Sequence, residues 1–82
     1  MSDAQQSAGA QLPLAMVHEG SAVTVVKVRG NDEMRRHLEN LGFVEGAEVK
    51  VVSQGSSAGT IASVKGAQVG IDHATAMHVF TN

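Results

Sequence analysis

Short hydrophobic segments bounded by glycine or polar turn residues recur along most of the chain and predict β-strands. The clearest is Glu48–Ser53, where valines at alternate positions would face a core while Glu48 and Lys50 would face solvent. The segment Ala22–Val28 is also rich in β-branched residues, but two of its valines are adjacent. Either both faces of that strand are partly covered or the strand contains a bulge. Further strands are expected at Thr60–Val64, Gln68–Ile71 and His78–Thr81.

One segment, from Asn31 to Phe43, has the pattern of an α-helix instead. Asn31 is a favourable N-cap, and Asp32 and Glu33 would lie in the first turn, where the helix dipole favours acidic side chains. Apolar residues recur at the spacing i, i+4 and i+7 and would form one stripe facing the core. The stripe consists of Met34, Leu38 and Leu41.

The end of this helix has an equally specific pattern. Gly42 stands where a left-handed residue ends a helix, and Phe43 can fold back against Leu38, as in a Schellman motif. Gly46 follows closely and predicts a tight turn before the next strand. We therefore assign a structural role to five residues of this corner, namely Leu38, Leu41, Gly42, Phe43 and Gly46.

The remaining segments predict turns and a second helical turn. Gln54–Gly59 is expected to be a flexible hairpin loop, Lys65–Ala67 a tight turn, and Asp72–Met77 one helical turn capped by Asp72. Strands this short leave exposed edges unless the sheet curls. The sequence therefore predicts a mainly β fold of about five strands with one short helix, arranged as a small, partly open barrel. This domain would occupy residues 13–82, after a disordered polar tail at residues 1–12.

Composition and charge exclude several kinds of function. The 82 residues include no cysteine, so disulfides and thiolate metal sites are excluded. The formal net charge is −2, and two phenylalanines are the only aromatic residues, which argues against a nucleic-acid surface and a proline-binding groove. No apolar run approaches the roughly 20 residues of a membrane-spanning helix, and residues 1–12 do not resemble a secretory signal. We expect no nucleic-acid partner and no insertion into a membrane.

Three motifs at fixed spacing resemble one known family. The first is L-x-x-L-G-F-x-x-G-x-x-V-x-V, which runs from Leu38 to Val51. The second is V-x-G-x-x-V-x-I at Val64–Ile71, and the chain closes with AMHVFT at Ala76–Thr81. Together they resemble the FeoA family over Leu12–Thr81, which is nearly the whole of the predicted domain.

The resemblance implies both a fold and a function. FeoA proteins are small cytosolic partners of the FeoB ferrous-iron transporter, and their barrel is similar to an SH3 domain. The resemblance therefore implies an SH3-like β-barrel that binds the cytosolic part of FeoB and modulates its assembly or activity in bacterial ferrous iron uptake. It implies a cytoplasmic protein that its partner holds at the inner membrane. Two departures concern partner contacts: Ser56, Ser57 and Ala58 replace a segment that usually contains proline, and Asp72 replaces a basic residue.

The sequence contains few residues suited to metal, phosphate or catalytic chemistry. Asp72, His73 and His78 could hold a divalent ion, but no histidine pair has the i, i+4 spacing of a preformed helical site, and solvated surface histidines are the more common case. The glycine-rich Gly55–Thr60 lacks the lysine and the following helix of a phosphate loop. The serines lack a nucleophile elbow. We predict no metal site, no cofactor and no catalytic residue, and so no enzyme. The histidines are His18, His37, His73 and His78.

What remains is a protein-binding surface. The outer face of the predicted helix presents Arg35, Arg36 and His37, with Glu39 beside them, and we predict that these four residues contact the partner. The alternative is an ordinary solvated helical face. A second function also stays open, in which the barrel regulates an iron-dependent repressor or another metal-responsive protein. Short free strand edges additionally allow a weak homo-oligomer.

Overall fold

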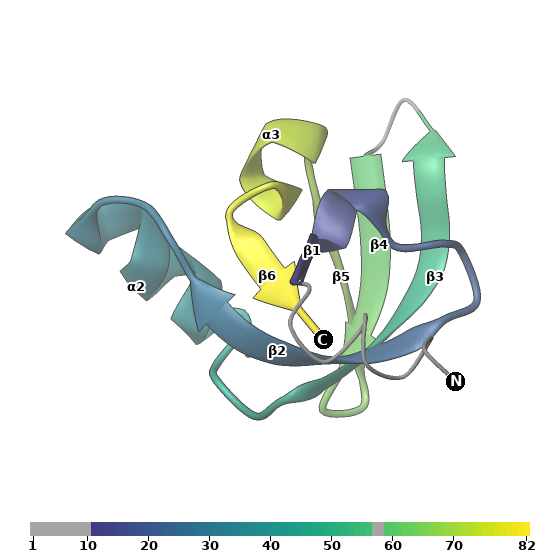
Figure 1. The fold of residues 1–82 in the computed structure, drawn as a ribbon, viewed down its shortest axis with the longest axis horizontal. Helices are drawn as coiled ribbons and strands as arrows, with labels where there is room; N and C mark the ends of the chain where they lie inside the picture. The colour runs from purple at the N-terminus through teal and green to yellow at the C-terminus, as the bar shows by residue number, and fades with distance from the viewer. Residues whose placement is uncertain (1–10, 57–58) are drawn as a thin grey trace.

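The computed structural model describes residues 11–56 and 59–82, and these form a single antiparallel sheet accompanied by short helices (Figure 1). The sheet has six strands in the order β1-β6-β2-β3-β4-β5, one strand more than expected. The mainly β fold is confirmed. The elements are β1 (Leu12–Pro13), the 3-10 helix η1 (Leu14–Met16), β2 (Ala22–Val28), α2 (Asp32–Asn40), β3 (Glu48–Ser56), β4 (Gly59–Val64), β5 (Ala67–Ile71), α3 (His73–Ala76) and β6 (Val79–Thr81).

Strand β2 belongs to both halves of the sheet. Its first residues, from Ala22 to Thr24, pair with β3, whereas its second half pairs with β6. The pairing register shifts between Val25 and Lys27, so the bulge that the adjacent valines left open is present. Because a bulge increases local twist, β2 bends across the molecule and curls the sheet (Figure 1). The result is a partly open barrel, since β1 and β5 end the strand order without pairing to each other.

Aliphatic side chains fill the barrel. The alternation predicted for β3 is confirmed, because Val49 and Val51 are buried while Glu48 and Lys50 are exposed. Phe43 is the largest fully buried side chain. The other core residues are Leu14, Ala15, Val17, Val25, Leu38, Ala47, Ala62, Val64, Ile71, Ala76 and Val79.

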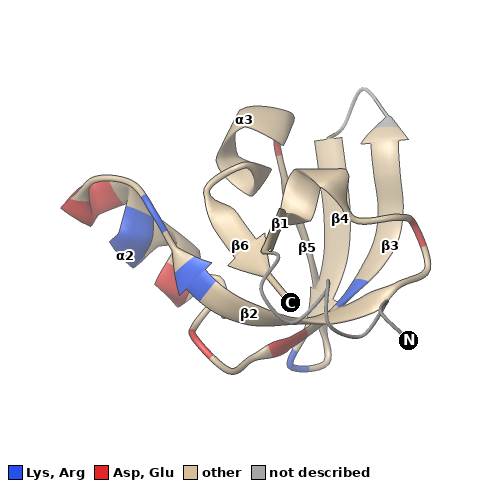
Figure 2. Cartoon of the chain, in the orientation of Figure 1, with Lys and Arg blue, Asp and Glu red and all other residues tan. Residues whose placement is uncertain are grey.

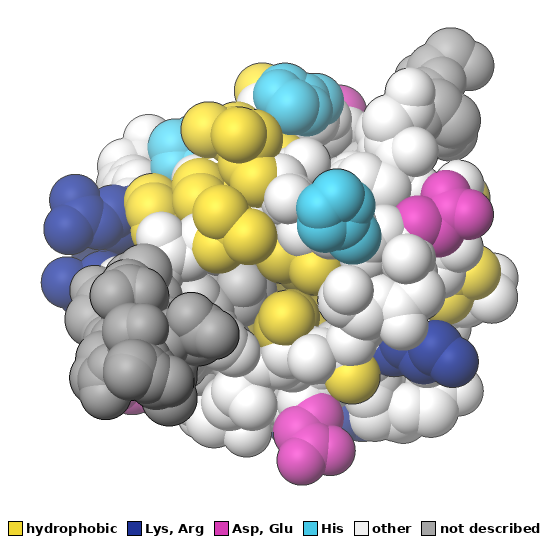
Figure 3. Space-filling view, turned by 45° about the vertical axis from the view of Figure 1, so that its right-hand side comes forward, with side chains coloured by type: hydrophobic (Ala, Val, Ile, Leu, Met, Phe, Trp, Pro, Cys, Tyr) yellow, Lys and Arg dark blue, Asp and Glu magenta, His cyan; other side chains and the backbone are white. Residues whose placement is uncertain are grey.

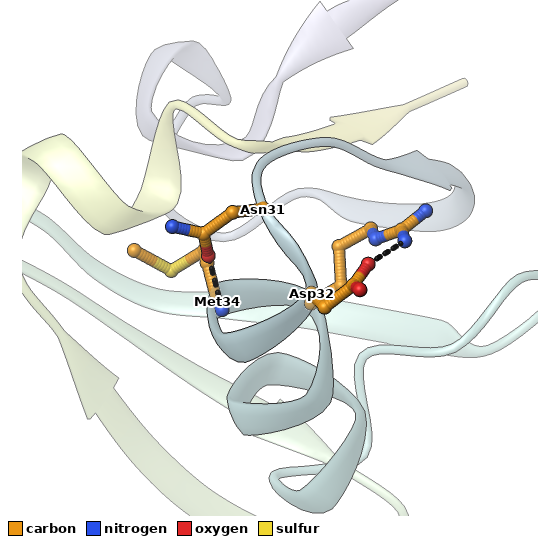
Figure 4. A network of polar contacts seen from close by, with 4 residues as sticks. Asn31, Asp32 and Met34 are labelled. Carbon is orange, nitrogen blue, oxygen red and sulfur yellow. Dashed lines mark hydrogen bonds and ion pairs between the residues drawn. The ribbon is translucent and has the colours of Figure 1, made fainter.

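Local signals determine where α2 begins and ends. Asn31 is the N-cap, and its side-chain oxygen accepts a hydrogen bond of 2.8 Å from the backbone N–H of Met34 (Figure 4). At the other end the backbone N–H of Phe43 donates to the carbonyl of Leu38 at 3.0 Å, and that of Gly42 donates to the carbonyl of Glu39 at 2.9 Å. This pair of bonds is the Schellman motif that the sequence predicted.

Gly42 and Phe43 of that motif stabilise the helix end in different ways. Gly42 has a φ of 106°, in the left-handed region that ends the helix without strain only for glycine. Phe43 and Leu38 are both fully buried, so the helix end is anchored in the core, and Leu41 between them is half-buried. Gly46 has a φ of 90° in the turn that follows. The N–H of Ala47 donates to the carbonyl of Val44 at 2.9 Å and closes this turn.

The C-terminal turns also follow the sequence pattern. Lys65 and Gly66 both have positive φ angles, 53° and 81°, as a two-residue hairpin turn of the primed type requires. Asp72 caps α3, and its carboxylate accepts a hydrogen bond of 2.8 Å from the N–H of Thr75. Hydrogen bonds from the side chain and backbone of Thr75 lower the pKa of Asp72, so this carboxylate is ionised at neutral pH.

The prediction that Gln54–Gly59 is a flexible loop is wrong at both ends. Strand β3 continues through Gln54 to Ser56, and β4 begins at Gly59. The side-chain nitrogen of Gln54 donates to the carbonyls of Leu14 and Val17 at 2.9 and 2.7 Å, while its oxygen accepts from the hydroxyl of Thr60 at 2.5 Å. Gln54 therefore ties the segment around η1 to two central strands.

The start of the domain is the other difference. The predicted tail includes Leu12, but this residue lies in β1 and pairs with Thr81. The hydroxyl of Thr81 also donates to the carbonyl of Leu12 at 2.8 Å. Residues 1–10, where the disordered tail was predicted, and Ser57 and Ala58 lie outside the described residues. In the part that is described, no helix is long and apolar enough to span a membrane.

Two glycine variants test how the helix end is built. Replacing Gly42 with alanine would place a Cβ 2.9 Å from the Cγ1 of Val64 in addition to the strain of a positive φ, so we expect a loss of about 2–3 kcal/mol. Gly46 also has a positive φ but nothing within 4 Å of the added Cβ, so Gly46→Ala should cost only about 1 kcal/mol. Urea unfolding of both variants measures the difference. Equal losses would contradict a role for the contact with Val64.

A second pair of variants tests Gln54. Gln54→Ala removes three side-chain hydrogen bonds, and at roughly 0.5–1.5 kcal/mol each we expect a loss of about 2–3 kcal/mol. Gln54→Glu keeps the shape but turns a carboxylate toward two carbonyls, so it should cost at least as much. Urea unfolding is the measurement, with the exposed Gln68→Ala as control. A stable Gln54→Glu variant would show that the donor is not needed.

Candidate functional site

Helix α2 projects from one end of the barrel (Figure 1). Of its residues, Leu38 alone is buried and Met34 is half-buried, while the others are exposed. The helix is therefore attached mainly through Leu38 and through the Leu41–Phe43 segment that follows it. This attachment leaves most of the helix surface free for contact with another molecule.

The exposed surface of α2 contains both signs of charge. Figure 2 shows acidic and basic residues along the helix and a basic residue at the adjacent end of β2. The side chain of Arg35 pairs with Asp32 across one turn, with 2.6 Å between Nη2 and Oδ1 (Figure 4). Both side chains are well exposed, 48% and 83%, and such surface pairs contribute at most about 1 kcal/mol. The pair therefore orients Arg35 without adding much to the stability of the helix.

The four residues predicted to contact a partner lie on α2 but do not form a single patch. Arg35, Arg36 and Glu39 line one shallow hollow together with Asp32. His37 lines a different hollow, of about 320 Å³, with Asn31, Glu33 and Met34. The exposed basic face thus comprises Arg35 and Arg36, and we name it, with Glu39, the α2 charged face. His37 belongs to the neighbouring side of the helix.

A groove lies between α2 and the barrel, next to the α2 charged face. It has a volume of about 230 Å³ and separates α2 from the end of β2 and from the turn before β3. Arg35 and Glu39 form its helical wall, and Lys27 and Glu45 lie across from them. The groove is lined by Val26, Lys27, Val28, Arg35, Glu39, Phe43, Val44 and Glu45. Charged residues therefore continue from the helix onto the barrel.

An apolar surface that the sequence pattern does not indicate lies at another part of the barrel. Leu12, Met16, Val52 and Met77 are 45%, 56%, 38% and 38% exposed, which is high for such side chains. Val52 lies on β3, and we name the other three, on β1, η1 and the end of α3, the apolar patch. Helix η1 packs against α3, which brings the segments of Met16 and Met77 together. Figure 3 shows hydrophobic and histidine side chains gathered on one face of the molecule. A hollow of about 330 Å³ adjoins it, lined by Leu12, Val17, His18, Ser21, Val23, Thr81 and Asn82.

The phenylalanines do not contribute a similar surface. Phe43 is fully buried, and Phe80 is half-buried with the guanidinium of Arg29 5.4 Å from the centre of its ring. This distance is typical of a cation–π contact. Arg29 thus covers Phe80 and adds a positive charge just before α2.

The described residues contain little that resembles catalytic machinery. No group of three His, Asp or Glu side chains is arranged to hold a metal ion in residues 11–56 and 59–82. The buried polar side chains of this part are Thr60 and Thr81, and both hydroxyls donate hydrogen bonds. What the geometry offers is two solvent-facing surfaces suited to another macromolecule.

Solved structures show the same fold. An iron uptake regulatory protein, FeoA, is 26% identical with a TM-score of 0.83, and the match covers 89% of this chain and 97% of that one. The Stenotrophomonas maltophilia FeoA, solved with zinc, is 26% identical with a TM-score of 0.74 and coverage of 87% and 89%. It is described as a prokaryotic SH3 domain protein and a candidate activating factor of bacterial ferrous iron transport. The SH3-like fold is thereby confirmed.

A more distant likeness extends to metal-dependent repressors. The T. acidophilum protein IdeR matches with a TM-score of 0.78 and 18% identity, over 89% of this chain but only 34% of the repressor, so the likeness concerns the fold alone. No curated protein matches the chain. The model of the FeoA domain matches residues 12–82. Because that match spans the whole barrel and most of the sequence, the chain belongs to the FeoA family.

Proposed function

We propose that this protein is an accessory component of bacterial ferrous iron uptake that binds the cytosolic part of a FeoB-type transporter and modulates its assembly or activity. Membership of the FeoA family supports the link to iron uptake. A relative of 26% identity is described as a candidate activating factor of that transport. The family is not a known enzyme family, and the proposal involves no chemical reaction by this chain.

The observation that favours a binding role is the position of α2. The helix is anchored at its C-terminal end by Leu38 and Phe43, and its exposed residues do not pack in the core. The α2 charged face offers two adjacent arginines, and the guanidinium group forms strong hydrogen bonds to carboxylates. We propose that Arg35 and Arg36 dock on an acidic surface of the transporter, with Glu39 and His37 at the margin.

Modulation requires more than binding. A partner that binds two states of the transporter equally shifts neither of them, so the affinity must differ between states. A difference of 1–3 kcal/mol, or about 5–150-fold in affinity, is typical of such coupling. Charge pairs with α2 would provide this difference if the acidic surface is accessible in one state only.

Two alternatives remain for the experiment to separate. The apolar patch is a second surface, since exposed hydrophobic clusters often mark interaction sites. The other alternative is a repressor as partner, which rests on the shared fold alone. The apolar patch is tested with a variant of Met16, and the repressor is tested directly as a binding partner.

The central test is binding of the cytosolic domain of the cognate transporter, measured by pull-down and calorimetry. Arg35→Glu/Arg36→Glu should weaken binding at least about tenfold, because each reversal replaces an attraction with a repulsion. The effect should shrink as salt is raised, as expected for exposed charges. Circular dichroism should show an unchanged fold.

Matched controls locate the surface. Lys50→Glu, which reverses one exposed charge on β3, is compared with Arg36→Glu alone, and only the latter should reduce affinity. Met16→Asp tests the apolar patch. Loss of binding with Met16→Asp but not with the double arginine variant would move the interface to the apolar patch. Binding to a metal-dependent repressor, with none to the transporter, would contradict the proposed function.

A further inference from the structure

Strand β5 forms an open edge of the sheet. It pairs with β4 along its whole length without a register shift, and it is the last strand in the order. Val64 and Ala67 flank the two-residue turn and therefore exchange hydrogen bonds, and bonded pairs alternate from there. It follows that the backbone N–H and C=O groups of Gln68 and Gly70 point away from β4. No other backbone group bonds to them among the residues described, and both residues are exposed.

This edge lacks the features that normally protect edge strands. Natural edges are made unsuitable for pairing by charged residues, proline, bulges or short length. The sequence of β5, AQVGI, has no charge and no proline. The opposite edge, β1, has only two residues, and one of them is Pro13. The two edges thus differ, and only β5 is suited to accept another strand.

We propose that β5 pairs with β5 of a second copy of this chain, antiparallel and centred on Val69. In this register Gln68 of each copy lies opposite Gly70 of the other, so the four free backbone groups of one strand meet the four of its partner. The two Val69 side chains lie directly opposite each other on the same face. A two-fold axis relates the copies, and the sheet continues from one barrel into the next.

The charges at the two ends of β5 support a second copy rather than an unrelated strand. Lys65 lies in the turn before β5, and Asp72 follows its last residue. Antiparallel pairing centred on Val69 brings the Lys65–Gly66 turn of one copy alongside Asp72 of the other. Asp72 is ionised at neutral pH, as described above. One lysine and one aspartate therefore meet at each end of the pair, and this complementarity exists only in the antiparallel arrangement.

The pairing should be weak. A contact through one five-residue strand buries less than roughly 1,000 Å², below what stable dimers use. Sedimentation velocity of the full chain should therefore show a monomer–dimer equilibrium between about 10 µM and 1 mM. Gln68→Pro removes an N–H that no backbone group among the described residues uses, so it should preserve the fold and abolish the dimer. A wild-type chain that stays monomeric, or forms larger assemblies, overturns the proposal.

Single cysteines test the register, because the chain has none of its own. Val69→Cys would place two thiols directly opposite each other, at a Cβ separation close to that of a disulfide. Gln68→Cys is the control. Residue 68 is more exposed than residue 69. In the proposed register, however, residue 68 of one copy lies diagonally across from residue 68 of the other copy rather than directly opposite it. Under mild oxidation the Val69→Cys variant should cross-link about tenfold faster. Random collisions would favour the more exposed cysteine at position 68, so equal or reversed rates contradict the proposed register.

The end charges provide a test that leaves β5 intact. Lys65→Asp places an acid beside Asp72 of the other copy and should weaken the dimer several-fold, while aspartate tolerates the positive φ of this turn. Asp72→Asn in the Lys65→Asp background removes the repulsion but keeps a good helix cap, so part of the association should return. If Asp72→Asn changes the dissociation constant of the dimer by the same factor with Lys65 and with Asp at position 65, the two side chains do not interact. That result would contradict the charge pairing. These experiments use no transporter, so their result is separate from that of the proposed function.

Discussion

The structure depends on one strand that serves both halves of the barrel. β2 must pair with β3 at its beginning and with β6 at its end, and a flat strand cannot satisfy both, because the two partners lie on differently oriented parts of the sheet. The register shift between Val25 and Lys27 resolves this by adding local twist where the partner changes. Val25 remains buried at this point, so the distortion does not interrupt the core. A barrel of so few residues has no second layer to bury its sheet, and curling is what encloses the aliphatic side chains.

The small interior of the curled barrel also explains why α2 lies outside it. The barrel interior is filled by valines, Phe43 and Leu38, which leaves no space for a helix with a broad apolar face. α2 therefore contributes one buried residue, and the Schellman motif fixes the angle at which the chain returns. Gly42 allows the left-handed turn and lies close to Val64, so helix and sheet meet at a point where a Cβ would crowd the side chain of Val64. The exposed side chains of α2 therefore do not contribute to the packing of the core.

How much the sequence could predict depends on the distance between the residues involved. The cap at Asn31, the glycine stop and the turn at Lys65 use neighbours within six positions, and each was predicted correctly. The role of Gln54 was missed because its side chain bonds carbonyls 37 and 40 residues away. Leu12 was placed in the tail because its partner Thr81 is 69 residues distant. The apolar patch arises in the same way, since only folding brings η1 to α3. For the candidate site, the sequence places the four polar residues Arg35, Arg36, His37 and Glu39 on the helix, but it does not show on which sides of the helix they lie.

A barrel this small can offer only limited surface to a partner, and this has a consequence for the two proposals together. A charged helical face and a single strand edge each give modest affinity, because exposed charges are screened and short edges bury little area. A two-fold pair formed through β5 would present two copies of the α2 charged face on one particle. If the transporter offers more than one docking site, the second contact becomes intramolecular, and the overall affinity rises by orders of magnitude without any stronger individual contact. Because the pair dissociates on dilution, binding would then respond steeply to the amount of this protein in the cell. Weak association is in this view what allows a small accessory protein to act only when enough of it is present.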